Sequence, residues 1–153
     1  MDATPYDQFL HTKMAPVPAR GFDVHAGALH PALYDFQRDI VQWALRQGTA
    51  GVFAAPGLGK TLMQCEWARH IPGRVLIFAP LAVTHQTVRE AQDKLGMPVQ
   101  YVRHQDAITE RVAITNYEMW PRFLDMDIAG IVLDESGILK GLTGKTRQKL
   151  TEM

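Results

Sequence analysis

One stretch, from Gly51 to Thr61, constrains the fold of this chain more than any other. It begins with the small and apolar residues 51–55 (GVFAA), which are typical of a buried strand. A bend containing Gly57 and Gly59 follows, and a helix is predicted to begin at Lys60. Backbone N–H groups in such a bend, with the positive end of the helix dipole, form an anion site. The sequence therefore predicts a strand, a phosphate-binding loop and a helix in direct succession.

The side chains of this loop have the chemistry of a nucleoside triphosphate site. Lys60 is predicted to reach the β- and γ-phosphates, and the Thr61 hydroxyl is predicted to ligate Mg²⁺. The pattern G-x-x-x-x-G-K-[ST] is complete except for its first glycine, which is Ala54 here. A glycine-rich turn that binds nothing is the alternative. The loop residues predicted to contact the nucleotide are Pro56, Gly57, Leu58 and Gly59.

A second candidate segment lies far downstream, where the apolar residues 130–133 run into Asp134-Glu135. Parallel α/β sheets bind ligands beyond the carboxyl ends of their strands. Asp134 is therefore predicted to hold Mg²⁺ directly or through water, and Glu135 to polarise an attacking water molecule as a catalytic residue beside Lys60. An exposed acidic loop is the alternative interpretation of this pair.

Apolar runs alternate with helical periodicity along the chain, which predicts a mostly parallel sheet covered by helices on both faces. Residues 1–32 are rich in proline and glycine and are predicted to form a partly irregular N-terminal arm. Residues 33–153 are predicted to form the α/β domain. Helices are expected at 33–47, 60–70 and 83–95, and strands at 51–55, 75–79, 99–102, 112–115 and 130–133.

Composition excludes several classes of protein. The 153 residues carry 16 basic and 16 acidic side chains, so no overall charge attracts the chain to nucleic acid. The single cysteine, Cys65, excludes an internal disulfide and a cysteine-based zinc site. No apolar run is long enough to span a bilayer, and the first residues lack a signal-peptide pattern. We expect a cytoplasmic protein without a membrane partner.

The order of the motifs resembles the first RecA-like lobe of superfamily-two helicases and translocases. Within them it is most similar to the Swi/Snf-type DEAD/DEAH-box group, and to its small members carried by phages and prophages. The matching segments are Leu33 to Gln37 (the glutamine motif), Ala55 to Thr61 (motif I), Ala79 to Thr84 (motif Ia), Ile114 to Glu118 (a DNA-side motif), Leu133 to Ser136 (motif II), and Lys140 with Thr143 to Arg147 (a basic stretch).

The resemblance implies an α/β, RecA-like P-loop fold with three layers, and it extends the predicted site. Phe36 and Gln37 would contact the base, since a glutamine amide can both donate to and accept from an adenine edge. By itself, Gln37 would be interpreted as a solvated helical residue. The residues implied to contact nucleic acid are Pro80, Leu81, Thr84, Thr115, Asn116, Tyr117, Lys140, Lys145 and Arg147. Tyr117 could equally be a packed aromatic residue. The basic residues after motif II are equally typical of a solvated helix face.

Two departures from the family pattern stand out. Gly137 occupies the place of a histidine that many relatives carry after motif II. The sequence also stops at Met153, before a motif III strand and a second lobe with its arginines. In this fold the motif III strand lies between the strands that precede motifs I and II. We therefore expect a truncated or split lobe whose sheet lacks a middle strand, and unpaired backbone groups at the gap would be costly. Either the two flanking strands pair with each other, or something else fills the gap, or the lobe is only marginally stable.

Three functions remain open at this point. The first is the ATP-binding lobe of a DNA-dependent ATPase, with ATP and Mg²⁺ as cofactors and with sequence-independent, salt-sensitive contacts to DNA. Its partner would be a second lobe or a complementing chain, and turnover would be weak without arginines from that lobe. The second is a non-catalytic module that binds DNA or protein. The third, a P-loop kinase or transport ATPase, would need a lid or signature segment that the sequence does not show.

Overall fold

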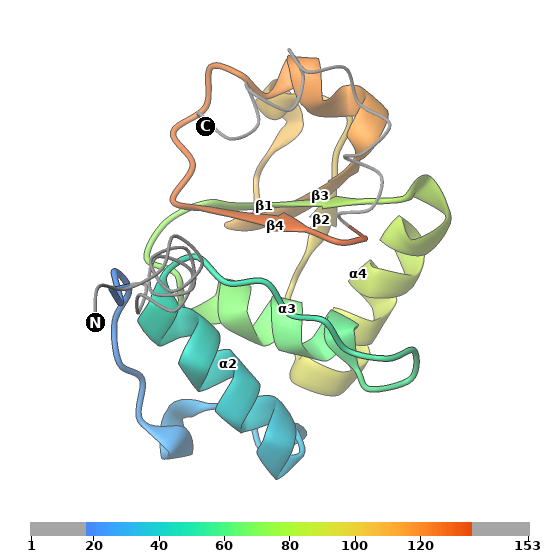
Figure 1. The fold of residues 1–153 in the computed structure, drawn as a ribbon. Coiled ribbons are helices and arrows are strands. Elements are labelled where there is room, and N and C mark those ends of the chain that lie inside the picture. Colours follow the sequence, from blue (N-terminus) through green and yellow to red (C-terminus); the bar gives the residue numbers. More distant parts are fainter. Residues whose placement is uncertain (1–17, 136–153) are drawn as a thin grey trace, which may run out of the picture.

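A computed structural model describes residues 18–135 of the chain (Figure 1). Predictions that fall on 1–17 and 136–153 lie outside the described residues. They include part of the N-terminal arm, the substitution at Gly137 and the proposed nucleic-acid contacts of Lys140, Lys145 and Arg147.

The centre of the fold is a four-stranded sheet in which every pairing is parallel, with the strand order β2-β3-β1-β4. The strands are β1 (Val75–Ala79), β2 (Gln100–Tyr101), β3 (Val112–Asn116) and β4 (Gly130–Leu133). All five residues of β1 are buried, as the continuous apolar run predicts for a strand covered on both faces. The predicted α/β class with a parallel sheet is confirmed.

Three α-helices lie together on one face of this sheet (Figure 1). They are α2 (Asp35–Gln47), α3 (Lys60–His70) and α4 (Leu81–Leu95). The other face is covered, within the described residues, by the 3₁₀ helix η3 (Tyr117–Arg122) and the chain that follows it. Two further 3₁₀ turns are η1 (Ala26–Ala28) and η2 (Gln105–Ala107). Helices were expected on both faces, so the described layers are less symmetric than the sequence predicts.

Alternate side chains of β1 enter two separate apolar cores. Val75 and Ile77 pack into the core beneath the helices, and Phe78 packs into the core beneath η3 together with Tyr117 and Phe123. This alternation follows from the period of two residues along a strand. Both cores hold β1 in place, and the carboxyl end of β1 is where the predicted site lies.

The strand predicted for residues 51–55 does not form, and this prediction is wrong. The segment has no strand assignment, and the Phe53 side chain is 96% exposed. A strand needs a neighbour to pair its N–H and C=O groups. The edge strand β4 pairs with β1 on one side, and no strand from residues 18–135 lies on its other side. The segment that precedes the loop therefore lies outside the sheet.

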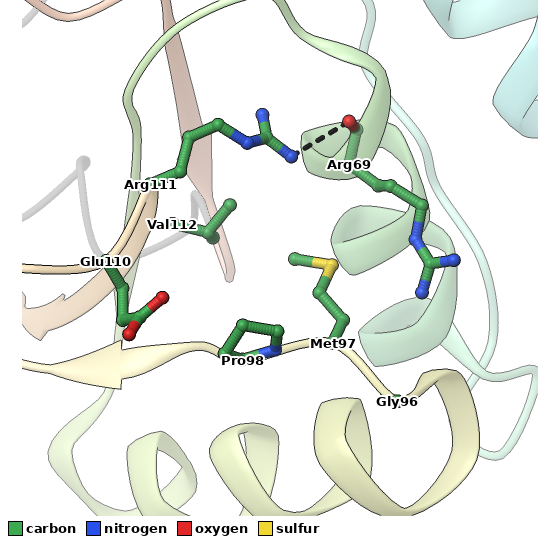
Figure 2. A pocket seen from close by; sticks show the side chains of 7 residues that line it. All are labelled: Arg69, Gly96, Met97, Pro98, Glu110, Arg111 and Val112. Atoms are coloured by element: carbon green, nitrogen blue, oxygen red, sulfur yellow. Dashed lines mark hydrogen bonds between the residues drawn. The ribbon is translucent and has the colours of Figure 1, made fainter.

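Arg111, directly before β3, anchors the carboxyl end of α3. Its guanidinium donates to the backbone oxygens of Ala68 (3.1 Å), Arg69 (2.9 Å) and Ile71 (2.7 Å). Figure 2 shows the side chain reaching across to the Arg69 carbonyl. The last carbonyls of a helix lack partners within the helix and carry partial negative charge, so a cation is favourable there.

We predict that Arg111→Ala lowers the free energy of unfolding by about 1.5–3 kcal/mol, the range for hydrogen bonds to a charged group. The expected result is an earlier midpoint in urea unfolding with an unchanged slope. The exposed Arg103, changed to alanine, is the matched control and should lie within about 0.5 kcal/mol of the wild type. Equal midpoints for both variants would contradict the anchoring role.

Candidate functional site

The loop between residues 55 and 60 has the backbone geometry that an anion site needs. Gly57 and Gly59 have φ values of +85° and +76°, in the left-handed region that favours glycine. A Cβ atom on Gly57 would meet nothing within 4 Å, so the space beside the loop at this residue is open. Gly59 is the N-cap of α3 and accepts from the N–H groups of Leu62 (3.0 Å) and Met63 (3.1 Å).

The helix α3 begins at Lys60, as the sequence predicts. The backbone N–H groups of Lys60 and Thr61 lie in its first turn, where a helix supplies no carbonyl partner. These donors and the positive end of the helix dipole face the loop. The local geometry is therefore that of a helix N-terminus available to an anion.

The Lys60 side chain folds back onto the loop. Its ammonium donates to the backbone oxygens of Ala54 (2.9 Å) and Ala55 (3.2 Å). These bonds fix the segment before the loop to the start of α3, although that segment lacks a strand partner. A phosphate carries a full negative charge and would compete well with neutral carbonyls for the ammonium.

Asp134 lies at the carboxyl end of β4, where its backbone N–H donates to the Phe78 oxygen (2.9 Å). Burial raises the pKa of its carboxyl, the neighbouring Glu135 raises it further, and the Lys60 ammonium acts in the opposite direction. The helix α3, which begins at Lys60, has its N-terminus toward the same edge of the sheet (Figure 1). The fold thus brings the two segments predicted from sequence into one site.

Gln64 is a member of this site that sequence analysis missed. Its side chain lies beside the Asp134 carboxyl and lowers the pKa of that group. The amide nitrogen of Gln64 is buried and has no partner within hydrogen-bond distance, so it is a neighbour of the carboxyl without a formed hydrogen bond. The sequence spacing could have predicted this, because Gln64 follows Lys60 by one helical turn and lies on the same face of the helix.

Glu135 has a φ of +56°, which is unusual for a residue with a side chain. Such a conformation costs of order 1 kcal/mol and occurs most often at functional sites.

The oxygen donors of the site fit a hard divalent cation. Thr61 supplies a hydroxyl at the start of α3, and Asp134 supplies a carboxyl beside Lys60. Within residues 18–135 there is no group of three His, Cys, Asp or Glu side chains that would form an all-protein metal site. Mg²⁺ at phosphate sites needs only one or two protein ligands, with phosphate and water completing the shell.

The two residues expected at the base differ in exposure. Phe36 is 44% exposed and stacks on Tyr34, which is 71% exposed, with ring centroids 6.1 Å apart. Gln37 is only 3% exposed and is bonded within the protein, to Tyr34 and to Leu58 of the loop. An aromatic surface is therefore available beside the loop, whereas the glutamine amide is enclosed.

Most of the described residues expected to contact nucleic acid are buried. The Tyr117 side chain stacks on Phe78 and donates through its hydroxyl to the Asp134 backbone oxygen. In this structure Tyr117 is therefore a packed aromatic residue, which is one of the two alternatives that the sequence left open. Burial raises the pKa of its hydroxyl, and the nearby Asp134 and Glu135 raise it further. The other buried members are Thr84, Thr115 and Asn116. The side chains of these four residues are too buried to contact nucleic acid directly in this structure. Leu81, which is 54% exposed, and the half-buried Pro80 remain accessible.

A hollow of about 320 Å³ lies at the other end of the strands, near the start of β3 (Figure 2). Two of its lining side chains are Arg69 and Arg111, and both donate to backbone carbonyls. The two guanidinium groups bind backbone oxygens at the carboxyl ends of α3 and α4 and so hold these ends in place. The hollow takes no part in the predicted chemistry.

Comparisons with known proteins agree with this architecture. No protein-family model matches the chain, and no curated protein matches it. Among solved structures, the chain is similar to the crystal structure of the UvsW helicase from bacteriophage T4, with a TM-score of 0.61 and 14% sequence identity. The match covers 99% of this chain and 56% of that chain, so this chain spans about half the length of its neighbour.

The similarity identifies the fold as that of a RecA-like helicase lobe. At 14% identity it extends to the fold alone. In the part of the chain that the structure describes, no helix has the length and apolarity needed to cross a membrane.

We predict that Asp134→Asn makes the ligand-free chain more stable at pH 7. The raised pKa means that the folded state binds the proton more tightly than the unfolded state, so stability is lost as the pH rises above the ordinary value of 3.8. Thermal unfolding should show a higher Tm for the variant at pH 7 and a smaller difference at pH 4. Asp125→Asn, at an exposed position, is the control. A lower Tm for Asp134→Asn at pH 7 would refute the assignment.

Proposed function

We propose that this chain is the ATP-binding lobe of a DNA-dependent ATPase of the helicase or translocase type. The observation that carries the proposal is that the N-terminus of α3, at Lys60, and the end of β4, at Asp134, lie toward the same carboxyl edge of the sheet. The left-handed glycines before α3 support it, because they let the loop backbone approach an anion at the N-terminus of that helix.

Each residue of the site has a role in this proposal. The backbone N–H groups of residues 57–61 and the Lys60 ammonium would bind the triphosphate, while Thr61 and Asp134 would hold Mg²⁺. The metal, when bound, neutralises charge that develops on the transferred phosphoryl group. Glu135 orients the attacking water, and Phe36 contacts the base. We also propose that the chain is a member of the Swi/Snf-type DEAD/DEAH-box group. Within that group we place it among the phage-borne members, which act in a bacterial cytosol.

The first test is Mg-ATP binding measured by isothermal titration calorimetry on the purified chain. Lys60→Ala removes the ammonium that neutralises the β- and γ-phosphates, so we expect at least a tenfold loss of affinity. Lys94→Ala, an exposed lysine change on α4, is the matched control and should bind as the wild type does. Equal affinity in Lys60→Ala would contradict the assignment of this loop.

We further propose that full activity requires a second lobe or a complementing chain, and that contacts with DNA are made to its backbone. Phosphoryl transfer depends on added positive charge, commonly an arginine, worth orders of magnitude in rate. Steady-state hydrolysis by this chain should therefore be slow or undetectable, with or without duplex and single-stranded DNA. Robust turnover stimulated by DNA would show that the chain needs no complement.

A non-catalytic module that binds DNA or protein is the second candidate. Two observations favour it: the segment around Phe53 is exposed, and within residues 18–135 no strand pairs with the outer edge of β4. Open strand edges readily pair with other chains. A folded wild-type chain that does not bind Mg-ATP would favour this function over the first.

A further inference from the structure

The Gln37 side chain forms two bonds that together join the start of α2 to the phosphate loop. Its Oε1 accepts from the Tyr34 backbone N–H (2.9 Å), which closes the first turn of α2. Its Nε2 donates to the backbone oxygen of Leu58 (2.9 Å), in the middle of the loop. One amide therefore connects a helix cap with the backbone that would surround a phosphate.

The rest of this amide is enclosed as well. The residue is only 3% exposed, so the side chain presents almost no surface to solvent. A Cβ atom on Gly59 would lie 2.4 Å from Nε2, which shows how closely the loop backbone covers the amide. Reading adenine would require a glutamine to face both N6 and N7 of the base edge. In this structure the Gln37 amide is turned to the protein instead.

We propose that Gln37 is a positioning residue for the phosphate loop and does not read the base. The site would then accept nucleoside triphosphates with little regard to the base, ATP and GTP alike. The proposal rests on the proposed nucleotide-binding function of this loop. It differs from what the family resemblance implies, because there the glutamine confers a preference for adenine.

The surface left for the base supports the same conclusion. The stacked rings of Tyr34 and Phe36 are exposed directly before Gln37. Aromatic stacking is tolerant of base identity, because every base has a π-face. Contact through these rings would add affinity for any nucleoside without distinguishing the hydrogen-bonding edge of adenine from that of guanine.

The test compares Mg-ATP, Mg-GTP and Mg-tripolyphosphate by calorimetry on the full chain. Tripolyphosphate reports on the loop alone, since it has no base. Gln37→Ala removes both bonds of the amide. Gln37→Glu keeps an acceptor for the Tyr34 N–H but loses the donor to Leu58, which protects the helix cap if the alanine variant does not fold. The matched control is Gln42→Ala, because Gln42 is on the same helix and donates to the Val24 oxygen (2.7 Å), away from the loop.

For the wild type we expect dissociation constants for ATP and GTP within about threefold of each other. Gln37→Ala should weaken ATP, GTP and tripolyphosphate by one common factor of about three to ten, the value of a lost hydrogen bond. The ATP-to-GTP ratio should stay unchanged in both Gln37 variants, and Gln42→Ala should bind as the wild type does.

Three results would overturn the proposal. A wild-type preference of tenfold or more for ATP that Gln37→Ala abolishes would make Gln37 a base reader and leave the nucleotide-binding function intact. Unchanged binding of all three ligands in Gln37→Ala would remove its positioning role. A folded wild-type chain that binds neither nucleotide nor tripolyphosphate would overturn the proposed function itself, and this inference with it.

Discussion

The whole site depends on the pairing of β1 with a parallel neighbour on each side. Val75–Ala79 is buried along its length between β3 and β4. Parallel strands in register bring their carboxyl ends to one edge of the sheet. Asp134 is placed there by its backbone bond to Phe78, and α3 packs beneath with its N-terminus toward the same edge. The apolar cores on both faces hold β1 in this position, and through it they hold the acidic group.

The ligand-free site contains groups whose arrangement opposes folding. Burial and Glu135 both disfavour the charged form of Asp134, and Glu135 itself has a left-handed backbone conformation. Lys60 offsets part of this cost for Asp134, while its ammonium is bonded to the loop carbonyls. A divalent cation with a triphosphate would supply positive charge to the carboxyl and negative charge to the ammonium. Groups that are unfavourable alone and complementary to a ligand are characteristic of binding sites.

The described structure also shows how a loop can be fixed without a strand before it. Residues 51–55 have no neighbour in the sheet, and Phe53 is exposed. The loop is held instead by Lys60, through Ala54 and Ala55, and by Gln37, through Leu58. Two side chains therefore supply the hydrogen bonds that a neighbouring strand would otherwise provide to this part of the chain.

Local patterns in the sequence determined the elements and the chemistry of the loop. The helix at Lys60–His70 and the strand at Val75–Ala79 have the predicted bounds, because apolar periodicity and flanking Gly and Pro are local signals. Only the tertiary structure decided which residues are neighbours. It buried Tyr117, enclosed Gln37, placed Gln64 beside Asp134 and left residues 51–55 unpaired. The reason is physical: a helix satisfies its hydrogen bonds within one segment, whereas a strand and a side-chain amide take partners from distant parts of the chain.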